Sequence, residues 1–470
     1  MAAIVFRSSV FFLLLFKIFS ATATATATAV GSYRKVKFLP GFSGPLPFVL
    51  ETGYVGVGES EEVQLFYYFV ESEANPETDP LLLWLTGGPG CSALTSLAFE
   101  IGPISFKEER FNGSLPQIIS NPYSWTKKSS IIFVDLPVGT GFSYGTTQEA
   151  LETGDFSQVH HSLQFLKKWL ADHPEFMSNS FYVGGDSYAG MIVPVVAQKI
   201  LEGNSDWPFV NFQGYVLGNP VTIRNSNQNF QVPYAHRMTL ISDELFEWLT
   251  TSCKGEYVNI DPNNVECLKH YDTYEKCVSK LEKGCILLPK CPFESPKQKD
   301  DHDRRSLYNT PKVFLDPKPP LPSLGCASYK FLLGYYWAND DQVQKALHIH
   351  EGSIGEWIRC KRREDYNFDI ESAFSCHVNL SSKGYRSLVY SGDHDMVVPH
   401  LDTQAWIRSL NYSIVDDWRP WFIVDQIAGY TRTYANKMTF ATIKGGGHTA
   451  EYTRKECSVM FSRWIAGESL

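Results

Sequence analysis

Short runs of apolar residues recur along the chain, and most of them end in glycine, proline or aspartate. Continuous apolar runs are typical of strands buried on both faces, in a parallel or mixed sheet that helices cover. An alternating segment at 438–443 also has the pattern of a strand. The pattern therefore predicts strands at residues 81–85, 131–134, 181–183, 215–217, 388–390 and 438–443.

Stretches with helical periodicity lie between these runs. Residues 157–171 place apolar side chains at Val159, Leu163, Phe165, Leu166 and Leu170, and residues 191–201 form a second apolar stretch of helical character. Strands that alternate with helices over most of a chain predict an open α/β sheet. Ligands of such sheets bind beyond the carboxyl ends of the strands, so the chemistry is expected in the loops that follow the runs.

The pattern changes between residues 225 and 338. Cysteines cluster there, and residues 290–322 are rich in charge and proline. We predict a cap inserted into the sheet domain, with an exposed linker at about 290–322. The core is then divided into a first part at 30–224 and a second part at 339–470. Arg304-Arg305 in the linker is either a processing site or part of a solvated loop.

The first 29 residues have the pattern of a signal peptide. Arg7 gives a positive start, residues 10–16 are apolar, and Ala27-Thr28-Ala29 is a small-residue cleavage site. Lys17 ends the apolar run after seven residues, whereas a membrane helix needs about 20. We predict a leader that is removed, and a mature protein outside the membrane.

Composition and charge exclude several classes of protein. The chain is 43% apolar and 20% charged, which excludes a disordered or collagen-like chain. Its net charge is −9, from 42 Lys and Arg against 51 Asp and Glu. Because no block of Lys or Arg is present either, the electrostatic requirement for binding nucleic acid is not met.

Cysteines and sequons agree with an oxidising compartment. Six of the ten cysteines fall between Cys253 and Cys326 without a closely spaced pair of the kind that zinc sites use. With a leader present, this usage predicts disulfides and no metal. The sequons at Asn112, Asn379 and Asn411 are predicted glycosylation sites. We expect a protein of the secretory pathway, either vacuolar or extracellular.

The strongest local signal surrounds Ser187. In Gly184-Gly185-Asp186-Ser187-Tyr188-Ala189-Gly190, a predicted strand enters and an apolar helix leaves. This is the pattern of a nucleophile elbow, a tight turn that exposes a serine hydroxyl above a sheet. Ala189 stands where the general pattern has a second glycine.

A serine nucleophile needs a base and a carboxylate that orients the base. In α/β-hydrolases these follow the nucleophile in the order acid, then histidine. Ser391-Gly392-Asp393 ends one predicted strand, and Gly445-Gly446-Gly447-His448 follows another. We predict Asp393 as the acid and His448 as the base, with His394, Asp395 and His400 as neighbouring alternatives that spacing does not exclude.

An oxyanion hole needs backbone N–H groups with little steric cover. The glycine run Gly87-Gly88-Pro89-Gly90 at the end of the first predicted strand supplies one donor, and the N–H of Tyr188 supplies the other. The run is not a phosphate loop, because no Gly-Lys-Ser/Thr follows it.

Together these motifs resemble the serine carboxypeptidase family of α/β-hydrolases, from about residue 36 to the C-terminus. The resemblance implies an α/β-hydrolase fold, Ser187 as nucleophile, Asp393 as acid, His448 as base, and the N–H groups of Gly88 and Tyr188 as the oxyanion hole. It also implies no cofactor, and disulfides pairing Cys91 with Cys360, Cys253 with Cys267, and Cys291 with Cys326.

The chain departs from the peptidases of that family at two positions. They carry Asn at position 86 and Glu at 186, which together with the acid matching Glu100 hold the carboxylate of the peptide. Here these positions are Thr86 and Asp186. Thr has no amide donors, and Asp is one methylene shorter than Glu. Both residues, and the segments 335–340, 355–360, 393–396, 408–412 and 416–421, resemble the plant acyltransferase branch.

The resemblance therefore implies transfer of an acyl group from a 1-O-acyl-β-D-glucose to an acceptor alcohol through Ser187. The partners would be these small molecules. One alternative is a working carboxypeptidase, which Glu100 and the triad favour and Thr86 and Asp186 oppose. The other is a non-catalytic partner of another enzyme, which the intact triad opposes. The sequence leaves the acyl group, the acceptor and the oligomeric state open.

Overall fold

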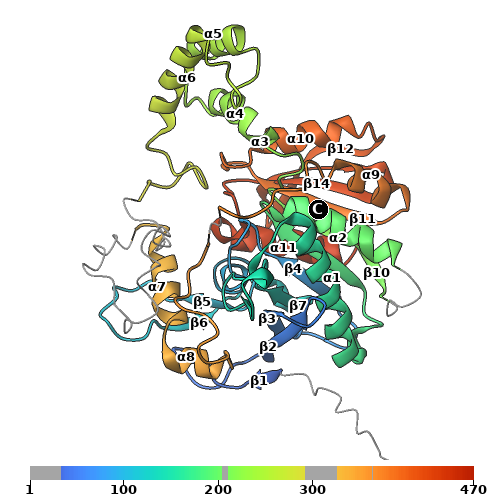
Figure 1. The fold of residues 1–470 in the computed structure, drawn as a ribbon. Helices are drawn as coiled ribbons and strands as arrows, with labels where there is room; N and C mark the ends of the chain where they lie inside the picture. Colours follow the sequence, from blue (N-terminus) through green and yellow to red (C-terminus); the bar gives the residue numbers. More distant parts are fainter. Residues whose placement is uncertain (1–32, 204–209, 292–324, 362–363) are drawn as a thin grey trace, which may run out of the picture.

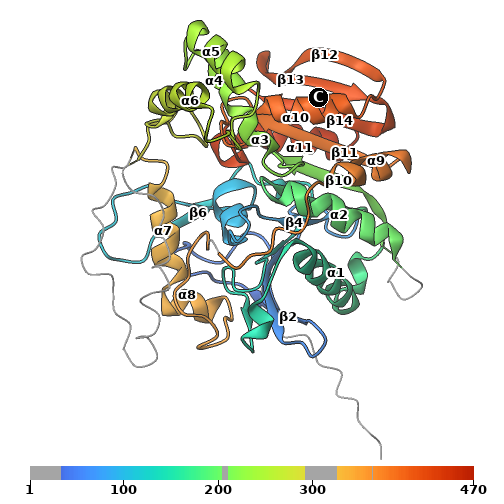
Figure 2. The ribbon, with the colours of Figure 1, turned by 45° about the horizontal axis from the view of Figure 1, so that its top comes forward.

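The computed structural model describes residues 33–203, 210–291, 325–361 and 364–470. In these ranges a large sheet carries helices on both faces, and a group of helices projects from one end (Figures 1 and 2). The predicted signal peptide and Arg304-Arg305 lie outside the described residues.

The strands of the described chain belong to one large sheet and one short pair. The large sheet has the order β1-β2-β3-β7-β4-β9-β10-β11-β14-β13-β12, with β8 beside β3, and β5 pairs with β6. Their bounds are β1 (Arg34–Val36), β2 (Leu50–Val57), β3 (Val63–Val70), β4 (Leu81–Leu85), β5 (Ile104–Phe106), β6 (Ile118–Ser120), β7 (Ser130–Val134), β8 (Tyr144–Gly145), β9 (Phe181–Asp186), β10 (Phe212–Gly218), β11 (Arg386–Gly392), β12 (Ile414–Ile423), β13 (Gln426–Tyr434) and β14 (Met438–Ile443).

The helices fall into those that cover the sheet and those of the projecting group. Their bounds are α1 (Asp155–Asp172), α2 (Ala189–Glu202), α3 (Ser226–Asn229), α4 (Gln231–Arg237), α5 (Asp243–Cys253), α6 (Val265–Val278), α7 (Tyr329–Ala338), α8 (Asp341–Ala346), α9 (Phe374–Ser382), α10 (His400–Ser409) and α11 (Arg454–Ile465). A π-helical turn, η1 (Ser96–Glu100), and a 3₁₀ turn, η7 (Ala450–Tyr452), lie close to the site described below.

The centre of the sheet is parallel. From β7 through β4, β9, β10 and β11 to β14, each strand runs parallel to its neighbour, while the outer strands are antiparallel. All six predicted strands lie within these elements, and residues 81–85 and 438–443 match β4 and β14 from end to end. The predicted α/β class is confirmed.

Two apolar cores fill the faces of the sheet. Along β4, Leu81, Leu83 and Leu85 pack with α1 and α2, whereas Leu82 and Trp84 pack with α7 and α11. Because successive side chains of a strand point to opposite faces, a strand covered on both sides must be apolar at every position. This explains why the runs in the sequence are continuous.

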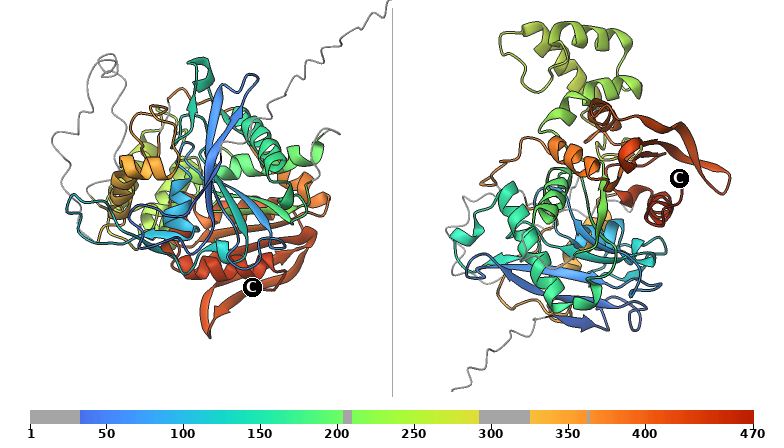
Figure 3. Two further views of the ribbon diagram at one scale, coloured as in Figure 1. Left: turned by 90° about the horizontal axis from the view of Figure 1, so that it is seen from below. Right: turned by 90° about the vertical axis from the view of Figure 1, so that its right-hand side faces the viewer.

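Helices α4, α5 and α6 form the projecting group, which stands apart from the body at the upper end in Figure 1 and in the right-hand view of Figure 3. Side chains such as Val232, Leu249 and Tyr274 make a small core that also takes in Met396 and Leu401 of the main body. This group begins at Gln231, shortly after residue 225, where the cap is predicted to start. The later helix α7, also within the predicted 225–338 segment, packs into the main core instead.

Candidate active site

The turn around Ser187 has the geometry of a nucleophile elbow. Strand β9 ends at Asp186, Ser187 has φ +54°, and α2 begins at Ala189. A Cβ on Gly185 would lie 2.4 Å from the Leu85 carbonyl oxygen and 2.6 Å from Ala189 Cβ. The close approach of strand and helix therefore requires glycine at 185, and the left-handed conformation at Ser187 is the strained feature of such elbows.

The structure brings a histidine and a carboxylate to this serine. His448 Nε2 lies 2.8 Å from Ser187 Oγ, and His448 Nδ1 lies 2.8 Å from Asp395 Oδ2. Asp395 is fully buried. Its carboxylate also accepts hydrogen bonds from Asn219 Nδ2 at 2.8 Å and from the backbone N–H of Val397 at 2.7 Å. These contacts fix the carboxylate opposite the imidazole.

The prediction that Asp393 is the acid was therefore wrong. Asp393 Oδ1 accepts the backbone N–H of Gly445 at 2.7 Å and lies 2.6 Å from His394 Nδ1. Strand β11 ends at Gly392, and the turn that follows points the first aspartate at the glycine loop. Two residues later the chain directs Asp395 toward His448. The remaining alternative, His400, lies at the start of α10, and burial lowers its pKa.

The predicted oxyanion segments touch each other at the elbow. A Cβ on Gly87 would lie 2.7 Å from Ser187 Cβ and 3.1 Å from the backbone nitrogen of Tyr188. Gly88 follows with φ +125°, a conformation that favours glycine. The loop that carries Gly88 is thus packed against the turn that carries Tyr188.

Three predicted substrate-binding residues form one buried polar network. Thr86 Oγ1 lies 2.9 Å from Ser96 Oγ, which donates to Glu100 Oε2 at 2.6 Å. Asp186 Oδ1 accepts the N–H of Gly87 at 2.9 Å, and the Asp186 and Glu100 carboxyl groups are hydrogen-bonded to each other. At most 7% of Thr86, Glu100 or Asp186 is exposed, so the network is shielded from water.

The surroundings of Glu100 and Asp186 favour one shared proton between the two carboxyl groups. Burial and the charge of Asp186 raise the pKa of Glu100 well above its usual value, and burial raises the pKa of Asp186. Two carboxylates in contact without solvent cannot both ionise at low cost, so one stays protonated and donates to the other. The site thus offers a neutral acid next to the nucleophile turn.

The basicity of His448 depends on the acids around it. Burial disfavours the imidazolium, but the charge and hydrogen bond of Asp395 stabilise it, and the charges of Asp186 and Glu451 add to the effect. The net result is a His448 pKa above its ordinary value. An imidazole of raised pKa is a stronger proton acceptor, which suits a general base.

Several residues that support the site were not predicted. Asn219 donates a hydrogen bond to the acid, Asp395, and Ser96 donates one to Glu100 of the carboxyl pair. Asp155 Oδ1 accepts the Tyr188 hydroxyl at 2.8 Å. The carbonyl of Gly284, in the predicted cap, accepts the N–H of His448 at 2.7 Å. Only Asn219 had a signal in the sequence, because it belongs to the Gly-Asn-Pro that follows the apolar run at 215–217.

All three implied disulfides are present. Cys91 bonds to Cys360, Cys253 to Cys267, and Cys291 to Cys326. The first joins the glycine loop to a segment 269 residues away, where Ser92 N–H also donates to the Arg359 carbonyl at 2.7 Å. It anchors one wall of the site.

We expect the paired substitution Cys91→Ser/Cys360→Ser to lower the free energy of unfolding by about 2–5 kcal/mol, because the link closes a very long loop. Denaturant unfolding measures this. The matched control is Cys277→Ser, an exposed cysteine that forms no disulfide in the described chain, with an expected change within about 0.5 kcal/mol. Equal effects of the two changes would contradict an anchoring role for this bond.

The remaining predicted features can be placed on the structure. Asn112, Asn379 and Asn411 are exposed, as glycan acceptors must be. No helix in the described residues is long and apolar enough to cross a membrane. Glycosylation itself stays a prediction.

The chain matches a known protein family over most of its length. The family model described as "Serine carboxypeptidase" matches residues 40–467. The chain belongs to the serine carboxypeptidase family. Serine carboxypeptidase-like 7 of Arabidopsis thaliana is 53% identical over 465 residues, covering 98% of this chain and 99% of the relative. Serine carboxypeptidase-like 2 of the same plant is 55% identical over 443 residues, covering 94% of each chain.

A solved structure extends the match to the fold. The prohormone-processing carboxypeptidase KEX1(DELTA)P of Saccharomyces cerevisiae superposes with a TM-score of 0.70, covering 92% of this chain and 95% of that one, at 18% identity. The predicted α/β-hydrolase fold of the serine carboxypeptidase family is thereby confirmed. The names of these relatives do not distinguish acyl transfer from peptide hydrolysis.

Proposed function

We propose that the protein is an acyltransferase that moves an acyl group from a 1-O-acyl-β-D-glucose to an acceptor alcohol. The observation that carries this proposal is the identity of residues 86 and 186 and the contacts that they make. The Thr86 hydroxyl is engaged by Ser96, and Asp186 is held by the Gly87 N–H and by Glu100. The amide donors with which the family's peptidases hold a peptide carboxylate are absent at position 86.

In the proposed reaction, Ser187 Oγ attacks the ester carbonyl while its proton passes to His448 Nε2. The N–H groups of Gly88 and Tyr188 stabilise the negative oxygen of the tetrahedral intermediate. When this intermediate collapses, the ester bond to glucose breaks and the sugar oxygen takes the proton from His448. Asp395 holds the imidazole in orientation and stabilises its positive form.

The second half repeats these steps with the acceptor. Its hydroxyl gives a proton to His448 and attacks the acyl carbon, and the bond to Ser187 Oγ breaks as the proton returns to the serine. Transfer prevails over hydrolysis when the acceptor is bound in position and water is disfavoured. The predicted leader, the sequons and the three disulfides support a site of action in the secretory pathway, vacuolar or extracellular.

The test is a paired assay of the purified, glycosylated protein beside Ser187→Ala. One arm offers 1-O-acylglucoses with mixed alcohols, and the other offers blocked dipeptides. We expect new esters from the wild type and none from the variant. Release of C-terminal residues without ester formation would replace the proposal with a carboxypeptidase. Failure of a fluorophosphonate to label Ser187 would favour a non-catalytic partner protein.

A further inference from the structure

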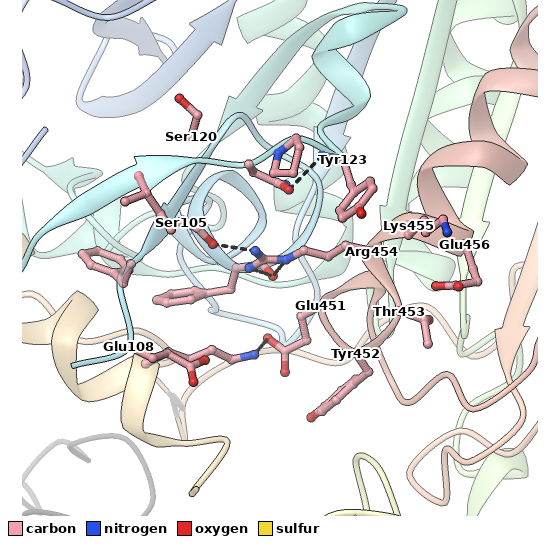
Figure 4. Close-up of a pocket in the computed structure, with 16 residues that line it drawn as sticks. Ser105, Glu108, Ser120, Tyr123, Glu451, Tyr452, Thr453, Arg454, Lys455 and Glu456 are labelled. Carbon is pink, nitrogen blue, oxygen red and sulfur yellow. Dashed lines mark hydrogen bonds and ion pairs between the residues drawn. The ribbon is translucent and has the colours of Figure 1, made fainter. Parts of the chain in front are cut away.

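One side chain connects the histidine segment with the carboxyl pair. Arg454 is the first residue of α11, six positions after His448, and it borders a cavity of about 430 Å³ beside η1 and η7. Figure 4 shows its guanidinium group near the centre of that cavity wall, turned toward Ser105. Arg454 is partly buried, and this burial lowers the pKa of its guanidinium group.

The guanidinium binds the end of the π-helical turn. Arg454 Nε and Nη2 donate to the Phe99 carbonyl at 2.9 and 2.6 Å, and Nη2 also lies 3.4 Å from the Ala98 carbonyl. Nη1 donates to Ser105 Oγ. The last carbonyls of a helix lack partners within it and carry a partial negative charge, so a cation at this end stabilises the turn.

This turn carries the groups that make the carboxyl pair. Ser96 begins η1 and Glu100 ends it, and the π-type hydrogen bond from Ile101 N–H to the Ser96 carbonyl at 3.0 Å closes it. Ser96 Oγ then donates to Glu100, which meets Asp186 next to Ser187. Arg454 therefore binds the backbone directly before the residue that completes the pair.

We propose that Arg454 is a positioning residue that fixes the π-helical turn so that Glu100 stays paired with Asp186 beside the nucleophile. The inference deepens the proposed function, since it treats this pair as part of the site that receives the acyl donor. The planar fork of arginine reaches Phe99, Ala98 and Ser105 at once, a geometry that the single ammonium group of lysine does not reproduce.

The test is a double-mutant cycle of Arg454→Met and Glu100→Gln, with Lys455→Met as the matched control. Lys455 is the next residue of α11, exposed, and lines the same cavity. In Arg454→Met we expect kcat/KM for an acylglucose to fall roughly 10- to 100-fold, as a small misplacement of a binding group does. Labelling of Ser187 by a fluorophosphonate should stay within about threefold, because the triad is untouched.

The cycle separates positioning from general damage. If Arg454 acts through Glu100, Arg454→Met has little further effect in the Glu100→Gln background. Equal losses in both backgrounds, or a parallel fall in Ser187 labelling, would overturn the inference. Lys455→Met should match the wild type in both assays, and Arg454→Lys should remain impaired.

A readout that needs no substrate distinguishes this inference from the proposed function. We expect the protonated carboxyl of the pair to give an infrared C=O band in pH-difference spectra, and Glu100→Gln to remove it. We expect Arg454→Met to shift or weaken that band and Lys455→Met to leave it unchanged. An unaltered band in Arg454→Met would overturn the positioning role even if acyl transfer is found. An altered band would support it even if the wild type proves to be a peptidase.

Discussion

Asp395→Asn is expected to lower kcat by about 10³- to 10⁴-fold, whereas Asp393→Asn keeps it within roughly tenfold. Asp395 is the carboxylate that contacts His448 Nδ1, at 2.8 Å, and it is fully buried. An asparagine there presents a neutral amide, which neither stabilises the imidazolium nor selects the tautomer whose Nε2 accepts the serine proton. Asp393 contacts Gly445 of the glycine loop and the His394 ring instead, so its loss affects the position of these neighbours and leaves the contact between Asp395 and His448 in place.

The measurement is steady-state turnover of whichever ester or peptide the wild type accepts, together with the rate of fluorophosphonate labelling. Both rates should fall steeply in Asp395→Asn and stay close to the wild-type rates in Asp393→Asn. Because the two residues are neighbours in one turn, each variant controls for local disturbance by the other. A larger loss in Asp393→Asn would restore the assignment made from the sequence.

That assignment shows how far the sequence determines the site. Ser187 is recognisable because a strand, a tight turn and a helix surround it, and His448 because three glycines and a strand precede it. No comparable pattern in the flanking sequence identifies the acid. Strand periodicity ends at Gly392, and which of the following side chains faces His448 depends on the turn and on hydrogen bonds from Asn219 and Val397.

The fold was predictable for a related reason. Strands covered on both faces have continuous apolar runs, so the strands of the sheet could be located from the sequence. The π-helical turn η1 left no such pattern, because its stability comes from Arg454, 354 residues after Glu100, and from the pairing of Ser96 with Glu100. Contacts this distant are set by packing. The disulfide pairings likewise came only from the family resemblance.

Residues 283–286, within the predicted cap segment, are hydrogen-bonded to the triad loops in a way that the sequence does not reveal. Besides the bond from His448 N–H to Gly284, Met396 N–H donates to the Lys283 carbonyl at 2.9 Å, and Ile286 N–H to the His394 carbonyl at 3.0 Å. One short segment thus binds the loops that carry both the base and the acid. The alignment of His448 with Asp395 therefore depends on the position of residues 283–286 as well as on the sheet.

The pH dependence of turnover is expected to follow His448. The base works only when neutral, and its pKa lies above 6.5 because the acids around it outweigh the effect of burial. We therefore expect kcat/KM to rise with pH and to reach a plateau, with its half-maximal value at a pH above 6.5, which we call the midpoint. Below the midpoint, kcat/KM should fall about tenfold for each pH unit. Stopped-time assays from pH 4.5 to 9 measure the midpoint, which for kcat/KM reports the free enzyme.

Glu451→Gln tests the electrostatic cause of that midpoint. Glu451 is buried, raises the pKa of His448, and pairs with Lys330 at 3.5 Å. Its neutralisation removes an attraction to the imidazolium and leaves the Lys330 charge uncompensated, and both changes favour neutral His448. The midpoint should move to lower pH, so the variant retains more of its maximal rate in acid. Glu456→Gln, on the same cavity wall, is the matched control and should leave the midpoint in place. A wild-type midpoint below 6.5, or equal shifts in the two variants, would show that solvation of His448 outweighs these charges.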